Sequence, residues 1–152
     1  MTYGITTSVH RPFDDTVTAV REALAEQGFG VLTEIDMAAT MKEKLDVDIA
    51  PQVILGACNP PLAHRALQAE ESVGLLLPCN VVVRDQGDGT TAVEALDPQV
   101  MVGVTGNPAL SPVASDAATR LRAALSAIAT AGPPPAGLSR VKEMAWNDQA
   151  RE

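Results

Sequence analysis

The sequence predicts an α+β protein built on a mostly antiparallel sheet, with helices packed on one face. Segments typical of strands and helices alternate over the first 80 residues, but the last two strand segments are joined by a tight turn at residues 85–89. Such a turn makes the two strands antiparallel neighbours. In addition, no glycine-rich phosphate loop follows a strand, since Gly28 and Gly30 precede one. A strict Rossmann alternation of parallel strands and helices is therefore excluded.

Hydrophobic periodicity predicts four elements in the first third of the chain. Phe13, Val17 and Leu24 recur at helical spacing, and Asp36 can cap a short helix. In order, the elements are an edge-like strand at 2–9, a helix at 12–27, a strand at 29–35 and a short helix at 37–45.

The remainder predicts three further strands and three helical segments. Asn59 is a good N-cap residue, and Pro60 suits the first position of the helix that follows it. Gly106 is expected to break the last helical region into a short and a long piece. In order, we expect a strand at 53–58, a helix at 60–70, a long strand at 73–84 interrupted at Pro78, a strand at 90–96, and helices from 97 to 130.

Composition limits the domain organisation and the partners. The chain has 152 residues, 46% hydrophobic, which suits one core at residues 1–131. A Pro/Gly linker at 132–137 leads to a tail at 138–152, which is either loosely ordered or a short helix docked on the body or on a second subunit. The net charge of −8 disfavours nucleic acid and anionic membranes as partners. The first residues lack signal-peptide character, so we expect a cytoplasmic protein.

Two sequence blocks carry a family resemblance. One runs through residues 26–36 with the motif at 42–45, and the other through 54–63 and 74–83. Together they resemble the family called domain of unknown function 302, over about residues 1–130. The resemblance implies a fold related to the TATA-binding-protein half-repeat, in the order β-α-β-β-β-β-α with extra short helices, assembled as a homodimer. It does not imply DNA binding, and the acidic charge argues against it. It implies no established activity. The family usually has a glycine where this chain has Asp46.

The two cysteines are the main candidates for chemistry. Cys58 ends a predicted strand just before a helix, where backbone N–H groups and the helix dipole favour a thiolate. Cys79 follows Pro78 and repeats the local Cys-Asn pattern. If their strands are neighbours, the sulfurs could form a redox pair or a sulfur-carrying site. The alternative is that both are buried small hydrophobes.

Other polar residues offer weaker candidates. His64 could join Cys58 and Cys79 in a metal site, but the spacing matches no tight zinc motif, so no metal or cofactor is predicted. Glu34 and Lys42 could form a buried pair that does acid–base work, or a surface salt bridge of little weight.

Three functions remain open at this point. The first is a homodimer that binds a small molecule without catalysis. The second is a thiol redox or sulfur-handling protein that uses Cys58 and Cys79, and the third is a purely structural or interaction domain. Asn59 and Asn80 lie beside the cysteines and could orient a ligand, although capping is the commoner role for Asn59. The candidate ligand-binding set is Glu34, Lys42, Cys58, Asn59, His64 and Asn80.

Overall fold

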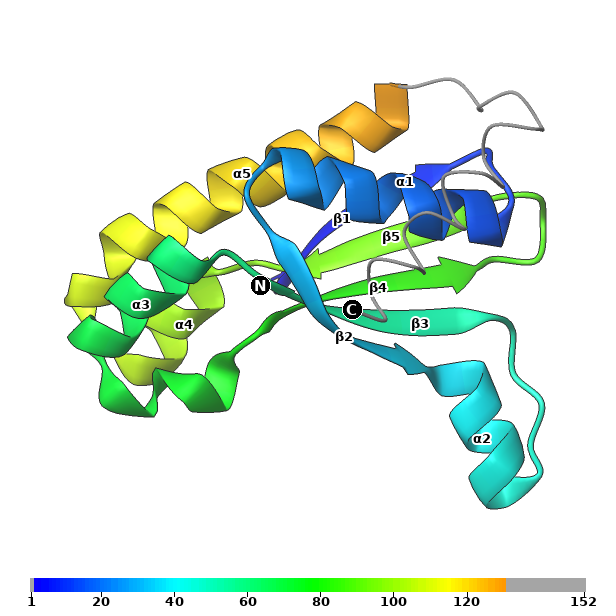
Figure 1. The fold of residues 1–152 in the computed structure, drawn as a ribbon, viewed down its shortest axis with the longest axis horizontal. Coiled ribbons are helices and arrows are strands. Elements are labelled where there is room, and N and C mark those ends of the chain that lie inside the picture. The colour runs from blue at the N-terminus through cyan, green and yellow to red at the C-terminus, as the bar shows by residue number, and fades with distance from the viewer. Residues whose placement is uncertain (1, 131–152) are drawn as a thin grey trace.

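A five-stranded antiparallel sheet organises the computed structural model, which describes residues 2–130 (Figure 1). The strand order is β1-β5-β4-β3-β2, and every neighbouring pair is antiparallel. The predicted α+β class is thereby confirmed. The predicted linker at 132–137 and tail at 138–152 lie outside the described residues. The strands are β1 (Gly4–Val9), β2 (Gly30–Asp36), β3 (Gln52–Cys58), β4 (Cys79–Asp85) and β5 (Thr91–Leu96).

The helices form a layer on one face of the sheet and a bundle beyond one of its ends. Helices α1 and α5 lie side by side across the sheet, whereas α3 and α4 gather past the point where β3 ends and β4 begins (Figure 1). The helices are α1 (Phe13–Glu26), α2 (Met37–Leu45), α3 (Pro60–Ala69), α4 (Gln99–Thr105) and α5 (Ser111–Thr130), with 3₁₀ helices η1 (Glu71–Leu76) and η2 (Pro108–Leu110).

Alternation along the strands divides the sheet into a covered face and an open face. On β4, Val81 and Val83 are fully buried under the α1–α5 layer, whereas Val82 and Arg84 point to the other side and are only partly buried. Leu24 of α1 and Leu121 of α5 complete the main core from the helix side. The aromatic-poor sequence therefore builds its core from aliphatic side chains, as its composition indicates.

A second apolar cluster holds the end bundle together. Leu62, Met101, Leu110 and Val113 are buried there with Val73 of η1. The prediction of a strand from residue 73 was wrong for its first half, because residues 71–76 form η1 and the strand begins at Cys79. Strand β3 turns into α3 after Cys58, so the residues before Pro78 have no β3 partner with which to pair.

The predicted Asp36 cap and the unusual Asp46 both occur at the ends of α2. The Asp36 carboxylate accepts a hydrogen bond from the Ala39 N–H at 2.9 Å, as predicted. Asp46 has φ = 54°, in the left-handed region. That conformation explains a glycine at this position in the family that the sequence resembles. Here the Asp46 carboxylate pairs instead with Lys42 Nζ at 2.9 Å.

Gly56 of β3 permits a close approach that brings β2, β3 and the start of β4 together. A Cβ at residue 56 would lie 2.9 Å from Cγ of Pro78 and would overlap Oγ1 of Thr33. A side chain there would therefore push apart the segments that lead to both cysteines.

We predict that Gly56→Ala lowers the free energy of unfolding by roughly 1–3 kcal/mol, the usual cost of overpacking. Urea unfolding followed by circular dichroism measures the change. Gly30→Ala in β2 is the matched control, because a Cβ at residue 30 meets nothing within 4 Å. A Gly56→Ala protein as stable as Gly30→Ala would contradict this packing.

Candidate functional site

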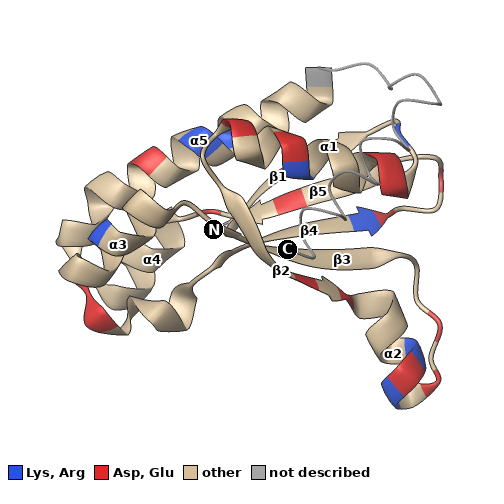
Figure 2. Cartoon of the chain, viewed as in Figure 1, with Lys and Arg blue, Asp and Glu red and all other residues tan. Residues whose placement is uncertain are grey.

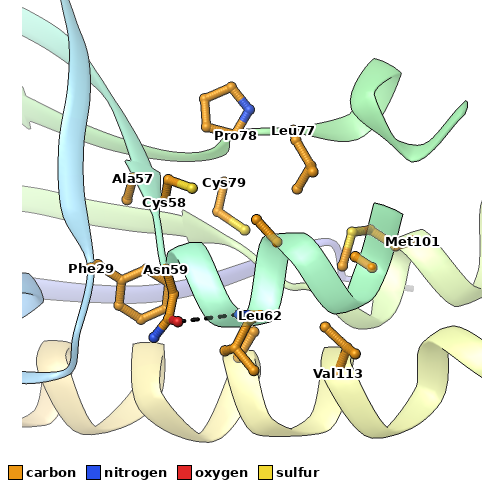
Figure 3. A pocket seen from close by; sticks show the side chains of 13 residues that line it. Phe29, Ala57, Cys58, Asn59, Leu62, Leu77, Pro78, Cys79, Met101 and Val113 are labelled. Atoms are coloured by element: carbon orange, nitrogen blue, oxygen red, sulfur yellow. Dashed lines mark hydrogen bonds between the residues drawn. The ribbon is translucent and has the colours of Figure 1, made fainter. Parts of the chain in front are cut away.

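Both cysteines lie where β3 and β4 meet the end bundle. Ala57 pairs with Cys79 across the two strands, and Cys58 is the next residue along β3. The two sulfur atoms point toward the space between the strand ends and α3 (Figure 3). The two strands that carry the cysteines are therefore neighbours, which the sequence alone had left open.

The space that the two sulfurs face is a small apolar cavity, here called the thiol pocket. It holds about 30 Å³ of free volume, enough for a ligand of roughly one or a few atoms. Its wall comes from β3, β4, α3, α4 and α5, and the Leu77–Pro78 peptide bond within it is cis. The lining residues are Phe29, Ala57, Cys58, Asn59, Leu62, Ala63, Ala66, Leu77, Pro78, Cys79, Met101, Val113 and Ala117 (Figure 3).

Asn59 is the polar residue in this wall, and its side chain is already engaged. Its Oδ1 accepts a hydrogen bond from the Leu62 N–H at 3.4 Å, which caps α3 as predicted. Its Nδ2 donates to the Gln27 carbonyl at 3.4 Å, just after α1. Asn59 therefore fixes the start of α3 and ties it to the end of α1.

Desolvation disfavours the thiolate form of both cysteines, and more strongly at the buried Cys79 than at the partly exposed Cys58. Desolvation raises the pKa of Cys58 above its ordinary value. Desolvation and the nearby charge of Cys58 raise the pKa of Cys79 to about 11. The helix start does not offset this desolvation at Cys58, because the N–H of Leu62 is taken by Asn59 and the apolar wall disfavours charge.

His64 does not join the cysteines. It is exposed on α3 and is absent from the wall of the thiol pocket. Within residues 2–130, no group of three or more His, Cys, Asp or Glu side chains is arranged to hold a metal ion. The mixed set Cys58, His64 and Cys79 is thus not assembled.

Glu34 and Lys42 take different partners. Glu34 accepts a hydrogen bond from the Arg21 guanidinium of α1 at 2.7 Å, so it ties β2 to the helix layer. Lys42 pairs with Asp46 at 2.9 Å and with Asp48 at 3.5 Å, and all three side chains are exposed. The predicted Glu34–Lys42 pair does not form, and neither residue lines the thiol pocket.

Asn80 lies on the open face of the sheet, opposite Gly56 in the β3–β4 register. The open face is hollowed there by about 410 Å³. An ion pair crosses it, with Arg84 of β4 donating to Glu94 of β5 at 2.8 Å. Figure 2 shows a basic stretch on β4 and an acidic stretch on the neighbouring β5. The hollow is lined by Tyr3, Gly4, Gln52, Asn80, Val82, Arg84, Glu94, Ala95 and Leu96.

The structure therefore brings together three of the seven predicted ligand-binding and thiol positions, Cys58, Asn59 and Cys79, and separates the rest. Sequence reasoning missed Met101, Phe29 and Ala117 as pocket residues. Met101 follows a helical pattern in the sequence and carries no local signal for a site, since only the packing of α4 against α5 and η1 brings it to the wall.

An antiparallel five-stranded sheet with one helix-covered face and a thiol-lined pocket at its end defines a small α+β protein. Comparison with known protein families then identifies the family to which this α+β protein belongs. The family described as domain of unknown function DUF302 matches residues 5–128, and the chain belongs to that family. The resemblance noted in the sequence is confirmed.

A solved structure supports the same assignment. The chain is similar to a crystal structure of an uncharacterized conserved DUF302 protein from Bacillus stearothermophilus, with a TM-score of 0.77 and 36% identity. The similarity covers 83% of this chain and 98% of the other. No curated protein matches the chain. Among the helices of residues 2–130, none combines the length and apolar character needed to cross a bilayer.

Proposed function

We propose that the protein binds a small ligand in the thiol pocket. The observation that carries this proposal is the convergence of both cysteines on one apolar cavity that the packing of five elements leaves unfilled. Close-packed interiors contain few such voids, so a cavity beside two potentially reactive groups is a natural binding position. The limited volume favours a ligand of few atoms.

A thiol redox or sulfur-handling role is the second candidate, favoured by the same convergence of sulfurs. Oxidation by hydrogen peroxide would join Cys58 and Cys79 through a disulfide, with the two thiol hydrogens passing to the peroxide, which is reduced to two water molecules. The raised thiol pKa values place this role second, because the thiolate is the nucleophile in such reactions. A reducing cytoplasm, where we propose that the protein resides, would also keep both thiols reduced.

Xenon tests whether the thiol pocket accepts a small apolar guest, since dry apolar cavities bind it. We expect xenon pressure to shift the methyl NMR signals of Ala57, Leu62, Ala66 and Met101 selectively. Signals that do not move, or that move equally across the protein, would overturn the proposal.

A filled pocket provides the control for the xenon experiment. Ala63→Leu on α3 adds volume to the wall and should abolish the selective shifts. His64→Leu adds an aliphatic side chain to the exposed side of the same helix and should leave them intact.

We also propose that the protein is a homodimer that pairs through the open face of the sheet. Two features support a second copy as the occupant. The open face carries the apolar Val82 and Leu96 beside opposite charges at Arg84 and Glu94. A twofold interface pairs a patch with itself, so each arginine could meet the glutamate of the second copy.

Light scattering tests this assembly. We expect a mass of twice 15.8 kDa for the native chain and a monomer for Val82→Glu, which places a charge in the middle of the open face. Leu75→Glu is the matched control, because Leu75 is 88% exposed on η1 and should leave the dimer intact. A native monomer, or a Val82→Glu dimer, would exclude this arrangement.

A further inference from the structure

We propose that the ligand of the thiol pocket is a single soft monovalent metal ion of the Cu(I) type, bound between the sulfurs of Cys58 and Cys79. This inference rests on the small-ligand function proposed above and names the class of ligand. Its basis is the set of donor atoms that the pocket offers and the space that it leaves.

The donor atoms of the thiol pocket are almost all sulfur. Cys58 and Cys79 approach from the ends of adjacent strands, and the thioether of Met101 lies in the wall toward α4 (Figure 3). The one side-chain amide, that of Asn59, is committed to the Leu62 N–H and the Gln27 carbonyl. Soft sulfur ligands select Cu(I) over hard cations such as Mg²⁺ or Ca²⁺.

The number of donors also separates Cu(I) from zinc. A structural zinc site needs four nitrogen, sulfur or oxygen ligands in a tetrahedron. The thiol pocket has two cysteines and neither a carboxylate nor an imidazole in its wall. Two thiolates alone can satisfy a soft monovalent ion, and a free volume of about 30 Å³ suits one ion better than a larger organic molecule.

Binding by this route is coordination without oxidation or reduction. Each thiol loses its proton to solvent, two sulfur–metal bonds form, and Cu(I) keeps its oxidation state. The metal ion offsets one of the two thiolate charges, and the remaining negative charge lies beside Cys58, which is partly exposed to solvent.

Anaerobic competition with the Cu(I) chelator bicinchoninate tests the inference on the full chain. We expect one Cu(I) per chain, and a loss of affinity of more than about 100-fold in Cys58→Ser, which exceeds the effect of removing an outer partner of a metal site. X-ray absorption at the copper edge should show sulfur neighbours. Stoichiometric zinc binding at the same concentration is not expected.

Two further variants keep the test decisive. Cys79→Ala should lose Cu(I) binding to the same degree, and circular dichroism of both variants without metal reports whether they fold. His64→Ala is the matched control, since His64 is exposed outside the pocket, and it should bind Cu(I) like the native chain.

The possible outcomes separate this inference from the function on which it rests. A native protein that does not bind Cu(I), or folded Cys58→Ser and Cys79→Ala proteins that bind it normally, would overturn the inference. If xenon still enters the thiol pocket in that case, small-ligand binding stands and only the metal assignment fails. If neither xenon nor Cu(I) enters, both proposals fail.

Discussion

The pairing of β3 with β4 is the interaction on which the rest of this structure depends. The register sets Ala57 opposite Cys79, so each strand delivers a cysteine to the same end of the sheet. Gly56 makes this end possible, because it lets Pro78 and Thr33 close over β3 without a side chain between them. The same strand ends then lead into the bundle of α3, α4 and α5, whose apolar side chains close the pocket around the sulfurs.

This arrangement also decides the chemistry of the thiols. A cysteine at a helix start is often activated, but Asn59 occupies the N–H of Leu62 and the wall around the sulfurs is apolar. Burial therefore dominates, and the pKa of each thiol is raised. A site of this kind suits the capture of a soft ligand better than rapid nucleophilic attack at neutral pH, which is why ligand binding stands ahead of redox chemistry in our account.

Much of the fold was predictable because its signals are local. The Asp36 and Asn59 caps, the glycine after α1 and the turn between β4 and β5 each act over a few residues, and the structure bears them out.

The thiol pocket was predictable only in part, since the Cys-Asn repeats mark two strand ends but not their register. The position of Met101 in the pocket wall depends on long-range packing of α4. The partner of Glu34 also depends on long-range packing, because α1 places Arg21 beside β2 and Glu34 pairs with Arg21 instead of Lys42. Residues 73–77 were mistaken for a strand because they form a continuous apolar run, although only Val73 is fully buried in the end bundle and Leu75 is exposed.

The central claim is that Cys58 and Cys79 share one pocket, and the titration of Cys79 tests it most directly. The NMR signal of ¹³Cβ-labelled cysteine can follow the pKa of Cys79 in the native chain and in Cys58→Ser. In the native chain we expect a pKa of about 11. In Cys58→Ser the charge of Cys58 is gone while the burial remains, so the pKa of Cys79 should fall part of the way toward the ordinary 9.0. An unchanged pKa would show that the two thiols do not sense each other and would contradict the shared pocket.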